Sequence, residues 1–163
     1  SLIDTGAESM TGGRLLRLKT LLENEESFCF TYGDGVGDVD ISSAIKFHKE
    51  HCKIATITGA TPPGRFGAIE TLGKMALNFR EKQDADSAIV NAGFFVLTPK
   101  VFDYLKDDQT VWENEPLEQL ALDEQLYVFK HFGFWQPMDT LRDKVILEDM
   151  WKTGSADWKV WKD

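Results

Sequence analysis

The stretch FCFTYGDGVGD, from Phe28 to Asp38, decides the fold class, because an apolar run ends in a glycine-flanked carboxylate, Asp34. A segment with helical spacing of apolar residues follows it. In open α/β sheets, ligands bind just beyond the carboxyl ends of the strands. An aspartate at such a position can bind Mg²⁺, which takes few carboxylates and keeps coordination positions for phosphate oxygens. The stretch therefore predicts an α/β fold with phosphate-centred chemistry.

Expected helices and strands alternate along the rest of the chain. Apolar spacing and capping residues predict helices over 14–23, 41–51, 115–123 and 140–152, and a short helix that opens at Thr98-Pro99. Continuous or alternating apolar runs predict strands over 27–32, 53–59, 66–71, 75–81, 88–97 and 125–131. This alternation predicts one α/β domain over residues 1–163, with a mixed, mostly parallel sheet and flanking helices.

Composition restricts the class of partner. The 163 residues are 42% apolar and 28% charged, as in an ordinary soluble domain, and no apolar run is long enough to span a membrane. The net charge of −9 argues against a nucleic-acid backbone as ligand. The sequence shows no signal peptide, and we interpret Cys29 and Cys52 as buried, reduced thiols. These features predict a cytoplasmic protein with neither a nucleic-acid nor a membrane partner.

A second carboxylate, Asp139, lies in the segment from Gly133 to Thr140, again between an expected strand and an expected helix. If both junctions lie on one rim of the sheet, Asp34 and Asp139 form a Mg²⁺ site that is open to phosphates. The alternative is that Asp139 caps the last helix, with Thr140 in its first turn. Spacing alone leaves both interpretations open and slightly favours the cap.

Three further segments are weaker candidates. Lys82 can neutralise a phosphate, Glu81 can accept hydrogen bonds from sugar hydroxyls, and Asn91 and Gly93 follow on the next strand, although a solvated charge run is the usual fate of such residues. The glycine pair before Arg14 can admit a nucleotide, or can form an ordinary turn. The loop with Arg65 and Gly67 can reach a phosphate or simply lie at the surface.

The histidines do not form a recognisable catalytic or metal pattern. His48 and His51 are three residues apart on an expected helix, but no cysteine or carboxylate completes a zinc site. His131 is expected to be structural.

Taken in order, five segments resemble the sugar-phosphate nucleotidyltransferases, most closely the branch that makes CDP-glucose. They are MTGGRL at 10–15, TYGDG at 31–35, PGRFGA at 63–68, NAGFF at 91–95 and FWQPMDTLRD at 134–143. The resemblance covers nearly the whole chain. It implies a nucleotide-diphospho-sugar transferase-like, Rossmann-like fold and the formation of CDP-glucose and pyrophosphate from CTP and glucose 1-phosphate with Mg²⁺.

The resemblance also implies a role for each matched residue. Asp34 and Asp139 would bind Mg²⁺ and, with Lys82, would be catalytic, while Glu81 would hold the sugar. The expected substrate-binding set is completed by Gly12, Gly13, Arg14, Gly33, Arg65, Gly67, Asn91 and Gly93. Catalysis would then depend on positioning and charge neutralisation rather than on a covalent nucleophile.

The sequence departs from the family pattern at two places. Gln83 replaces the proline that usually follows Glu-Lys, and the N-terminal strands and glycine-rich loop that cradle the triphosphate are not in the sequence. We therefore expect the isolated chain to be inactive, with an exposed strand edge that favours a homo-oligomer of at least two copies. The alternative functions are weak binding of a nucleotide sugar or sugar phosphate, or a role as an assembly module only.

Overall fold

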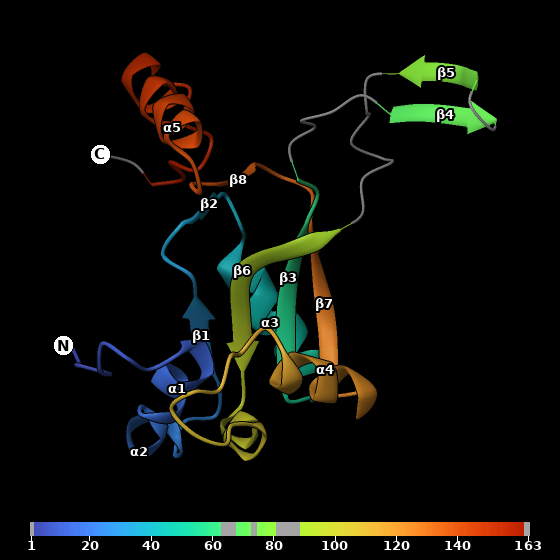
Figure 1. Ribbon diagram of the computed structural model, residues 1–163. Helices are drawn as coiled ribbons and strands as arrows, with labels where there is room; N and C mark the ends of the chain where they lie inside the picture. The colour runs from blue at the N-terminus through green and yellow to red at the C-terminus, as the bar shows by residue number, and fades with distance from the viewer. Residues whose placement is uncertain (1, 63–67, 73–74, 81–88, 162–163) are drawn as a thin grey trace. The chain divides into compact units, whose positions relative to one another are not determined.

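The computed structural model describes residues 2–62, 68–72, 75–80 and 89–161 (Figure 1). The chain divides into two compact units, which are described separately. The first contains Ser1–Thr31, Asp40–Thr58 and Gly93–Phe129, and the second contains Tyr32–Val39, Gly59–Ala92 and Lys130–Asp163. The expectation of a single domain stays a prediction.

A four-stranded sheet, mostly within the first unit, confirms the mixed α/β class. Its order is β1 (Phe28–Thr31), β6 (Val90–Leu97), β3 (Ala55–Ala60) and β7 (Leu126–His131). Figure 1 shows β1, β3 and β7 pointing one way and β6 the other. The antiparallel register pairs Phe28 with Leu97 and Thr31 with Phe94, and β1 lies at one edge of the sheet.

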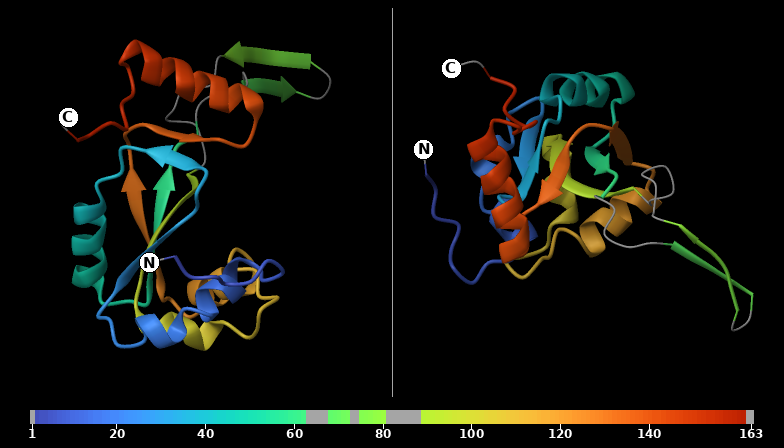
Figure 2. Two further views of the ribbon diagram at one scale, coloured as in Figure 1. Left: turned by 90° about the vertical axis from the view of Figure 1, so that its left-hand side faces the viewer. Right: turned by 90° about the horizontal axis from the view of Figure 1, so that it is seen from above.

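The helices of the first unit lie on both sides of this sheet. They are α1 (Thr11–Leu16), α2 (Lys19–Leu22), α3 (Ile41–His51), the 3₁₀ helix η2 (Pro99–Tyr104) and α4 (Glu115–Leu122). Figure 2 shows α3 on one side and α4 on the other. The prediction of a single helix over 14–23 is wrong in one respect, because the structure has two helices there. The N–H of Leu18 donates to the carbonyl of Leu15, and this tight turn separates α1 from α2.

Aromatic rings fill the core beneath the sheet. The Trp112 side chain is completely buried and meets Phe30 and Phe95 edge-on, with ring centroids 6.0 and 5.6 Å apart. Phe28 stacks on Phe102 of η2 at 6.0 Å. Edge-on aromatic pairs add about 1 kcal/mol each beyond the burial of their area. These contacts fix the segment that follows β6 against β1.

A buried histidine network joins α3 to β3. The N–H of Lys53 donates to Nδ1 of His51, so the proton of His51 is on Nε2, which donates to Thr56 Oγ1 at 2.7 Å. The Thr56 hydroxyl then donates to Nδ1 of His48 at 2.9 Å. The His48 side chain is 2% exposed, and its Nε2 has no hydrogen-bond partner among the described residues. The network therefore gives both histidines a structural role within the first unit.

The expectation that both cysteines are buried is wrong, because Cys29 and Cys52 are exposed. The exposed residues of β1 alternate with half-buried ones, which is the pattern of an edge strand, and Cys29 is one of the exposed residues. Cys52 ends α3 in the left-handed conformation, with φ 55°, where the chain turns at the surface.

The second unit contains two short ladders and a helix. A ladder pairs β2 (Gly35–Gly37) with β8 (Trp135–Pro137), a hairpin pairs β4 (Ala68–Leu72) with β5 (Met75–Arg80), and α5 (Leu141–Thr153) follows β8. The sequence predicted the hairpin and α5 but neither β2 nor β8. Within the described ranges, every helix is too short to cross a membrane.

Aromatic pairs hold the C-terminal segment in this unit. Trp158 packs on Phe134 with ring centroids 5.3 Å apart, and Trp161 packs on Trp151 at 6.3 Å. The α5 helix ends at Gly154, whose φ of 75° suits a residue without a side chain. The last turns of the described chain are thus anchored by rings rather than by strands.

We expect acid to destabilise the chain through His48. Burial, with a smaller effect of the charges on His51 and Lys49, lowers the pKa of His48 from 6.5 to about 4. Between these values the unfolded chain binds more protons, so this stability is complete above pH 6.5 and is lost as pH falls toward 4. The free energy of unfolding should fall by about 2 kcal/mol between pH 7.5 and pH 5 from this residue.

Urea denaturation at both pH values measures this loss. The His48→Gln variant should be less stable at pH 7.5 but should show a smaller decrease between the two pH values. An equal decrease in the variant would contradict the assignment to His48.

Candidate functional site

The β2–β8 ladder brings the two predicted carboxylates to the same place. Gly35 pairs with Pro137, and the ladder is extended by a hydrogen bond of 2.8 Å from the N–H of Met138 to the carbonyl of Asp34. Asp34 therefore precedes the first paired residue of β2, and Asp139 follows Met138 at the same end of the ladder. The structure thus places Gly33 and Asp34 at the same end of the ladder as Asp139, which follows them by more than 100 residues in sequence.

Asp139 does not cap α5, so the slight preference for a cap was wrong. Thr140 is the N-cap: its Oγ1 accepts from the N–H of Asp143 at 3.2 Å. The Asp143 carboxylate accepts in return from the N–H of Thr140 at 3.1 Å, which completes a capping box. Because Thr140 and Asp143 satisfy the end of the helix, the Asp139 carboxylate is available for another ligand.

A buried hydrogen bond joins the residues before Asp139 to those after it and so restrains this segment. Gln136 of β8 donates from Nε2 to Asp143 Oδ1 at 3.0 Å, and both side chains are buried. This bond joins the strand before Asp139 to the first turn of the helix after it. A site of this kind loses less conformational freedom when a ligand binds than a mobile loop does.

A clamp holds the opposite end of the ladder, where Asp38 follows β2 and Phe134 precedes β8. His131 Nε2 donates to the Phe134 carbonyl at 3.0 Å and lies 3.1 Å from Asp38 Oδ1. The N–H of Asp38 donates to the same carbonyl at 3.1 Å. Gly133 lies beneath this cluster, where a Cβ would come within 2.3 Å of Asp38 Oδ1 and 2.8 Å of His131 Cε1. His131 is structural, as expected.

Asn91 and Ala92 of β6 belong to the second unit and form hydrogen bonds within it. The Asn91 side-chain amide donates to the Tyr32 hydroxyl at 3.4 Å, and Tyr32 directly precedes Gly33. The Trp135 indole N–H donates to the carbonyl of Ala92 at 3.0 Å. Asn91 therefore lies near the segment that carries Asp34, whereas a contact with a sugar stays a prediction.

The site suits a cation that brings its own ligands. The Asp34 and Asp139 side chains are exposed and accept no hydrogen bond from the described residues. In the described part of the chain, no cluster of three or more metal-binding side chains occurs. Mg²⁺ commonly takes one or two carboxylates and completes its shell with water and substrate phosphates, so two free carboxylates fit Mg²⁺ better than Zn²⁺.

The predicted nucleotide-facing residues Gly12, Gly13 and Arg14 lie in α1 of the first unit and have packing roles there. The N–H groups of Gly12 and Gly13 both donate to the carbonyl of Thr110, at 2.9 and 3.1 Å. A Cβ on Gly13 would lie 2.2 Å from the carbonyl oxygen of Asp108. The Arg14 guanidinium donates to Thr5 Oγ1 and to the Ala7 carbonyl. Contact with a nucleotide stays a prediction.

The remaining predicted residues divide into two groups. Gly93 is buried in β6 with φ 79°, a conformation that favours glycine, so its conformation alone accounts for the residue type. Arg65, Gly67, Glu81 and Lys82 lie outside the described residues.

Comparison with known proteins identifies the family. The model of the Nucleotidyl transferase family matches residues 11–136. This match covers well over half of the chain, so the chain belongs to the nucleotidyltransferase family.

Similar proteins include a glucose-1-phosphate cytidylyltransferase from Salmonella typhimurium, which is 54% identical over 99% of this chain. A mannose-1-phosphate guanyltransferase beta-A from Xenopus laevis is 33% identical over 80% of it. The chain spans 63% of the length of the first relative and 39% of the second.

Two solved structures share the fold. They are the inositol-1-phosphate CTP transferase from T. maritima, with a TM-score of 0.62 and 15% identity, and HddC from Yersinia pseudotuberculosis, with a TM-score of 0.63 and 16% identity. The T. maritima structure covers 96% of this chain, and HddC covers 90%. This chain in turn covers 65% of the T. maritima chain and 64% of the HddC chain.

We expect Gly13→Ala to destabilise the chain strongly, because the new Cβ would clash with the backbone of Asp108 rather than with a movable side chain. The loss should exceed about 2 kcal/mol, as expected for overpacking of a close backbone approach. Gly33→Ala is the matched control, since no atom lies within 4 Å of its added Cβ. Equal unfolding midpoints in urea for both variants would contradict the packing role.

We also expect Gly133→Ala to weaken the clamp by about 1–2 kcal/mol, because its Cβ would displace the Asp38 carboxylate. Removal of that carboxylate in Asp38→Ala should reduce the cost of Gly133→Ala. A double-mutant cycle with urea denaturation measures this coupling. Additive losses in the double variant would show that the two side chains do not compete for the same space.

Proposed function

We propose that this chain contributes the sugar-phosphate and metal half of a cytidylyltransferase site, of the type that forms CDP-glucose and pyrophosphate from CTP and glucose 1-phosphate. The observation that supports this most directly is the ladder that places Asp34 and Asp139 at one end, with both carboxylates available. The similarity to a glucose-1-phosphate cytidylyltransferase supports the choice of base and sugar.

The two carboxylates would hold Mg²⁺ between them. Bound Mg²⁺ neutralises the charge that accumulates on phosphate oxygens during transfer. Asp34 and Asp139 would orient it, because the hydrogen bond from Met138 to Asp34 and the capping box at Thr140 restrain both backbone segments. Exposure of both side chains leaves room for phosphates and water. We assign Lys82 to the sugar phosphate and Glu81 to sugar hydroxyls by motif alone.

A second candidate function is binding without turnover. The chain spans 63% of its cytidylyltransferase relative, and the residues that we propose bind metal and sugar phosphate all lie within it. On this proposal the chain binds a nucleotide sugar weakly, with Mg²⁺, and turnover needs the remaining part of the fold. We also retain the expectation of a homo-oligomer, because β1 lies at an edge of the sheet.

The test is calorimetric titration of CDP-glucose into the chain with and without Mg²⁺. We expect Mg²⁺-dependent binding, and at least tenfold weaker binding in Asp34→Asn and in Asp139→Asn, because each variant removes a charged ligand of the ion. Asp157→Asn is the control, since Asp157 is also exposed and lies outside the site. Each variant keeps the size of the side chain, so its unfolding midpoint should change little.

The outcomes separate the two functions. Release of pyrophosphate from CTP and glucose 1-phosphate would support the enzyme, whereas Mg²⁺-dependent binding alone would support the binding function. Unchanged affinity in both site variants would show that the two carboxylates do not hold the ion.

A further inference from the structure

The first unit contains a cavity that shares no residue with the Asp34–Asp139 site. It has a volume of about 640 Å³, which is within the range of small-molecule pockets. It lies at the end of the sheet where β3 and β7 begin and β6 ends. The residues that line it are Glu26, Cys52, Lys53, Ile54, Thr98, Pro99, Lys100, Tyr104, Asp123 and Gln125.

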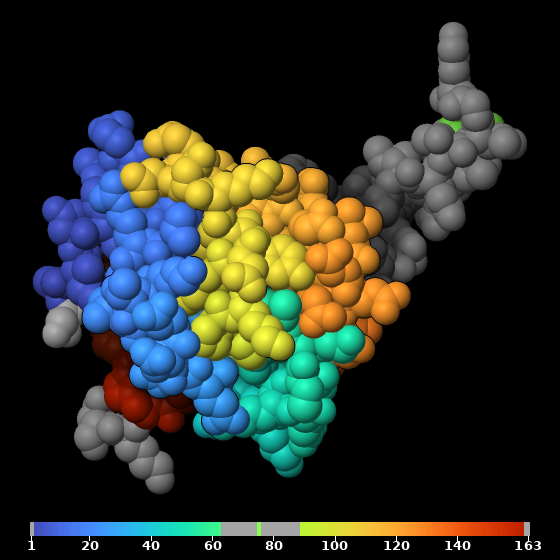
Figure 3. All heavy atoms as spheres, turned by 90° about the horizontal axis from the view of Figure 1, so that it is seen from below, coloured from blue at the N-terminus to red at the C-terminus, as the bar shows by residue number. Residues whose placement is uncertain are grey.

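Four segments that are far apart in sequence meet at this cavity. They are the turn before β1, the end of α3, the segment after β6 and the α4–β7 turn. Figure 3 shows this face, with the segment after β6 in yellow, α3 in teal and the α4–β7 segment in orange. Hydrogen bonds fix the wall: the N–H of Thr98 donates to the Ile54 carbonyl at 2.9 Å, and that of Ala55 to the Gln125 carbonyl at 3.0 Å.

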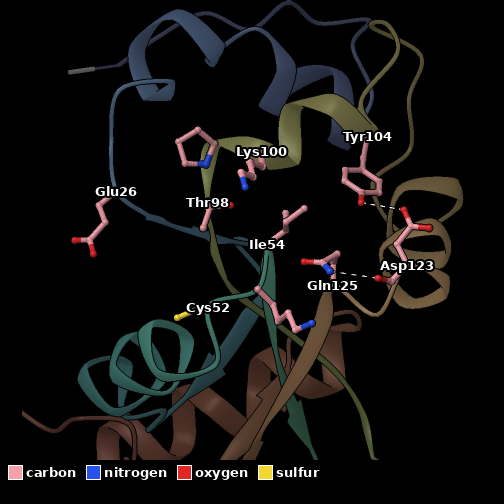
Figure 4. A pocket seen from close by; sticks show the side chains of 10 residues that line it. Glu26, Cys52, Ile54, Thr98, Lys100, Tyr104, Asp123 and Gln125 are labelled. Carbon is pink, nitrogen blue, oxygen red and sulfur yellow. Dashed lines mark hydrogen bonds between the residues drawn. The ribbon is translucent and has the colours of Figure 1, made fainter.

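The two acidic side chains of the cavity already have hydrogen-bond partners within the protein. Glu26 forms an ion pair with Lys49 at 2.7 Å, and this hydrogen bond lowers the pKa of Glu26. The Asp123 carboxylate accepts from the Tyr104 hydroxyl at 3.0 Å and from Gln119 Nε2 at 2.7 Å. Figure 4 shows the Tyr104–Asp123 bond on one side of the cavity. Glu26 is therefore neutralised by Lys49, whereas Asp123 is hydrogen-bonded to neutral donors and keeps its negative charge.

The two basic side chains of the cavity have fewer interactions than the acidic ones. Lys100 has no ion pair or hydrogen bond with the described residues, and Figure 4 shows it beside Thr98 at the cavity. The Lys53 ammonium lies 5.9 Å from the centre of the Tyr127 ring, a weak contact that leaves its donors free. The two ammonium groups outnumber the one carboxylate of the cavity, Asp123, that has no ion pair among the described residues, so the cavity favours an anionic ligand.

An unsatisfied hydroxyl lies in the same wall. Thr98 Oγ1 is buried and has no hydrogen-bond partner among the residues that the structure describes. A buried hydroxyl without a hydrogen-bond partner is unfavourable, so a ligand oxygen that pairs with it after a side-chain rotation would gain affinity. The carbon side chains of Ile54 and Pro99 complete a surface for the non-polar part of such a ligand.

We propose that this cavity is a binding site for a small phosphate ester, with Lys100 and Lys53 at the phosphate and Thr98 as a hydroxyl partner. The phosphate provides three acceptor oxygens for ammonium and hydroxyl donors. The volume leaves room for a sugar-sized group against Ile54. The site does not depend on Mg²⁺ or on the proposed function.

The experiment is an amide-resolved NMR titration of the whole chain with inorganic phosphate and then with glycerol 3-phosphate, in EDTA at constant ionic strength. We expect saturable shifts at the amides of Lys53, Lys100 and Gln125, and at least tenfold weaker binding in Lys100→Gln. Lys46→Gln is the charge-matched control, because Lys46 is 79% exposed and pairs only weakly, with Glu50 at 3.9 Å. Asp34→Asn should bind both probes as the parent chain does.

Three results would overturn the proposal. The first is the absence of saturable shifts with both probes, and the second is equal affinity in Lys100→Gln and Lys46→Gln. The third is tighter binding of malonate than of phosphate, which would assign the cavity to carboxylates instead. Loss of phosphate binding in Asp34→Asn would be a fourth contradiction, because it would place the phosphate at the ladder and not at this cavity. The first three results do not bear on Mg²⁺-dependent binding of CDP-glucose, so the two proposals are tested separately.

Discussion

The antiparallel ladder between β2 and β8 is the constraint on which the candidate site depends. Three residue pairs form it, and so few pairs are not stable alone in water. The bonds at its two ends therefore matter more than the ladder itself. His131 and the N–H of Asp38 hold the Phe134 carbonyl at one end, and the N–H of Met138 holds the Asp34 carbonyl at the other. The clamp stabilises a pairing whose far end carries both carboxylates.

Glycines in this chain serve close packing as often as they serve ligand access. Gly13 lets α1 approach the backbone of Asp108, and Gly133 leaves space for the Asp38 carboxylate and the His131 ring. Gly33, beside Asp34, has open space around it instead. The same residue type therefore reflects close packing at the first two positions and open surroundings at the third, and only the tertiary structure distinguishes them.

The chain combines a strongly acidic composition with local positions suited to anions. A net charge of −9 repels phosphates at long range, but salt screens that field within about 10 Å. Whether the charge of a bound phosphate is neutralised at short range then depends on which side chains have no ion-pair partner. At the cavity of the first unit Glu26 is paired with Lys49 and Lys100 has no ion pair with the described residues, whereas at the ladder the carboxylates are free to hold a cation that itself attracts phosphate.

Local periodicity and residues at strand ends were enough to predict the α/β class and the longer strands and helices, and they singled out Asp34 and Asp139 as candidates. The limits of α3 and α5 agree with their capping residues, Asp40 and Thr140. Only the tertiary structure decided that Asp34 and Asp139 meet and that Thr140, not Asp139, caps α5. The ladder responsible joins segments about 100 residues apart, and a three-residue strand has no periodicity that a sequence pattern can reveal. Burial of the cysteines was mispredicted because the exposure of Cys29 depends on which face of β1 it occupies and that of Cys52 on the surface turn after α3, and apolar neighbours in the chain reveal neither.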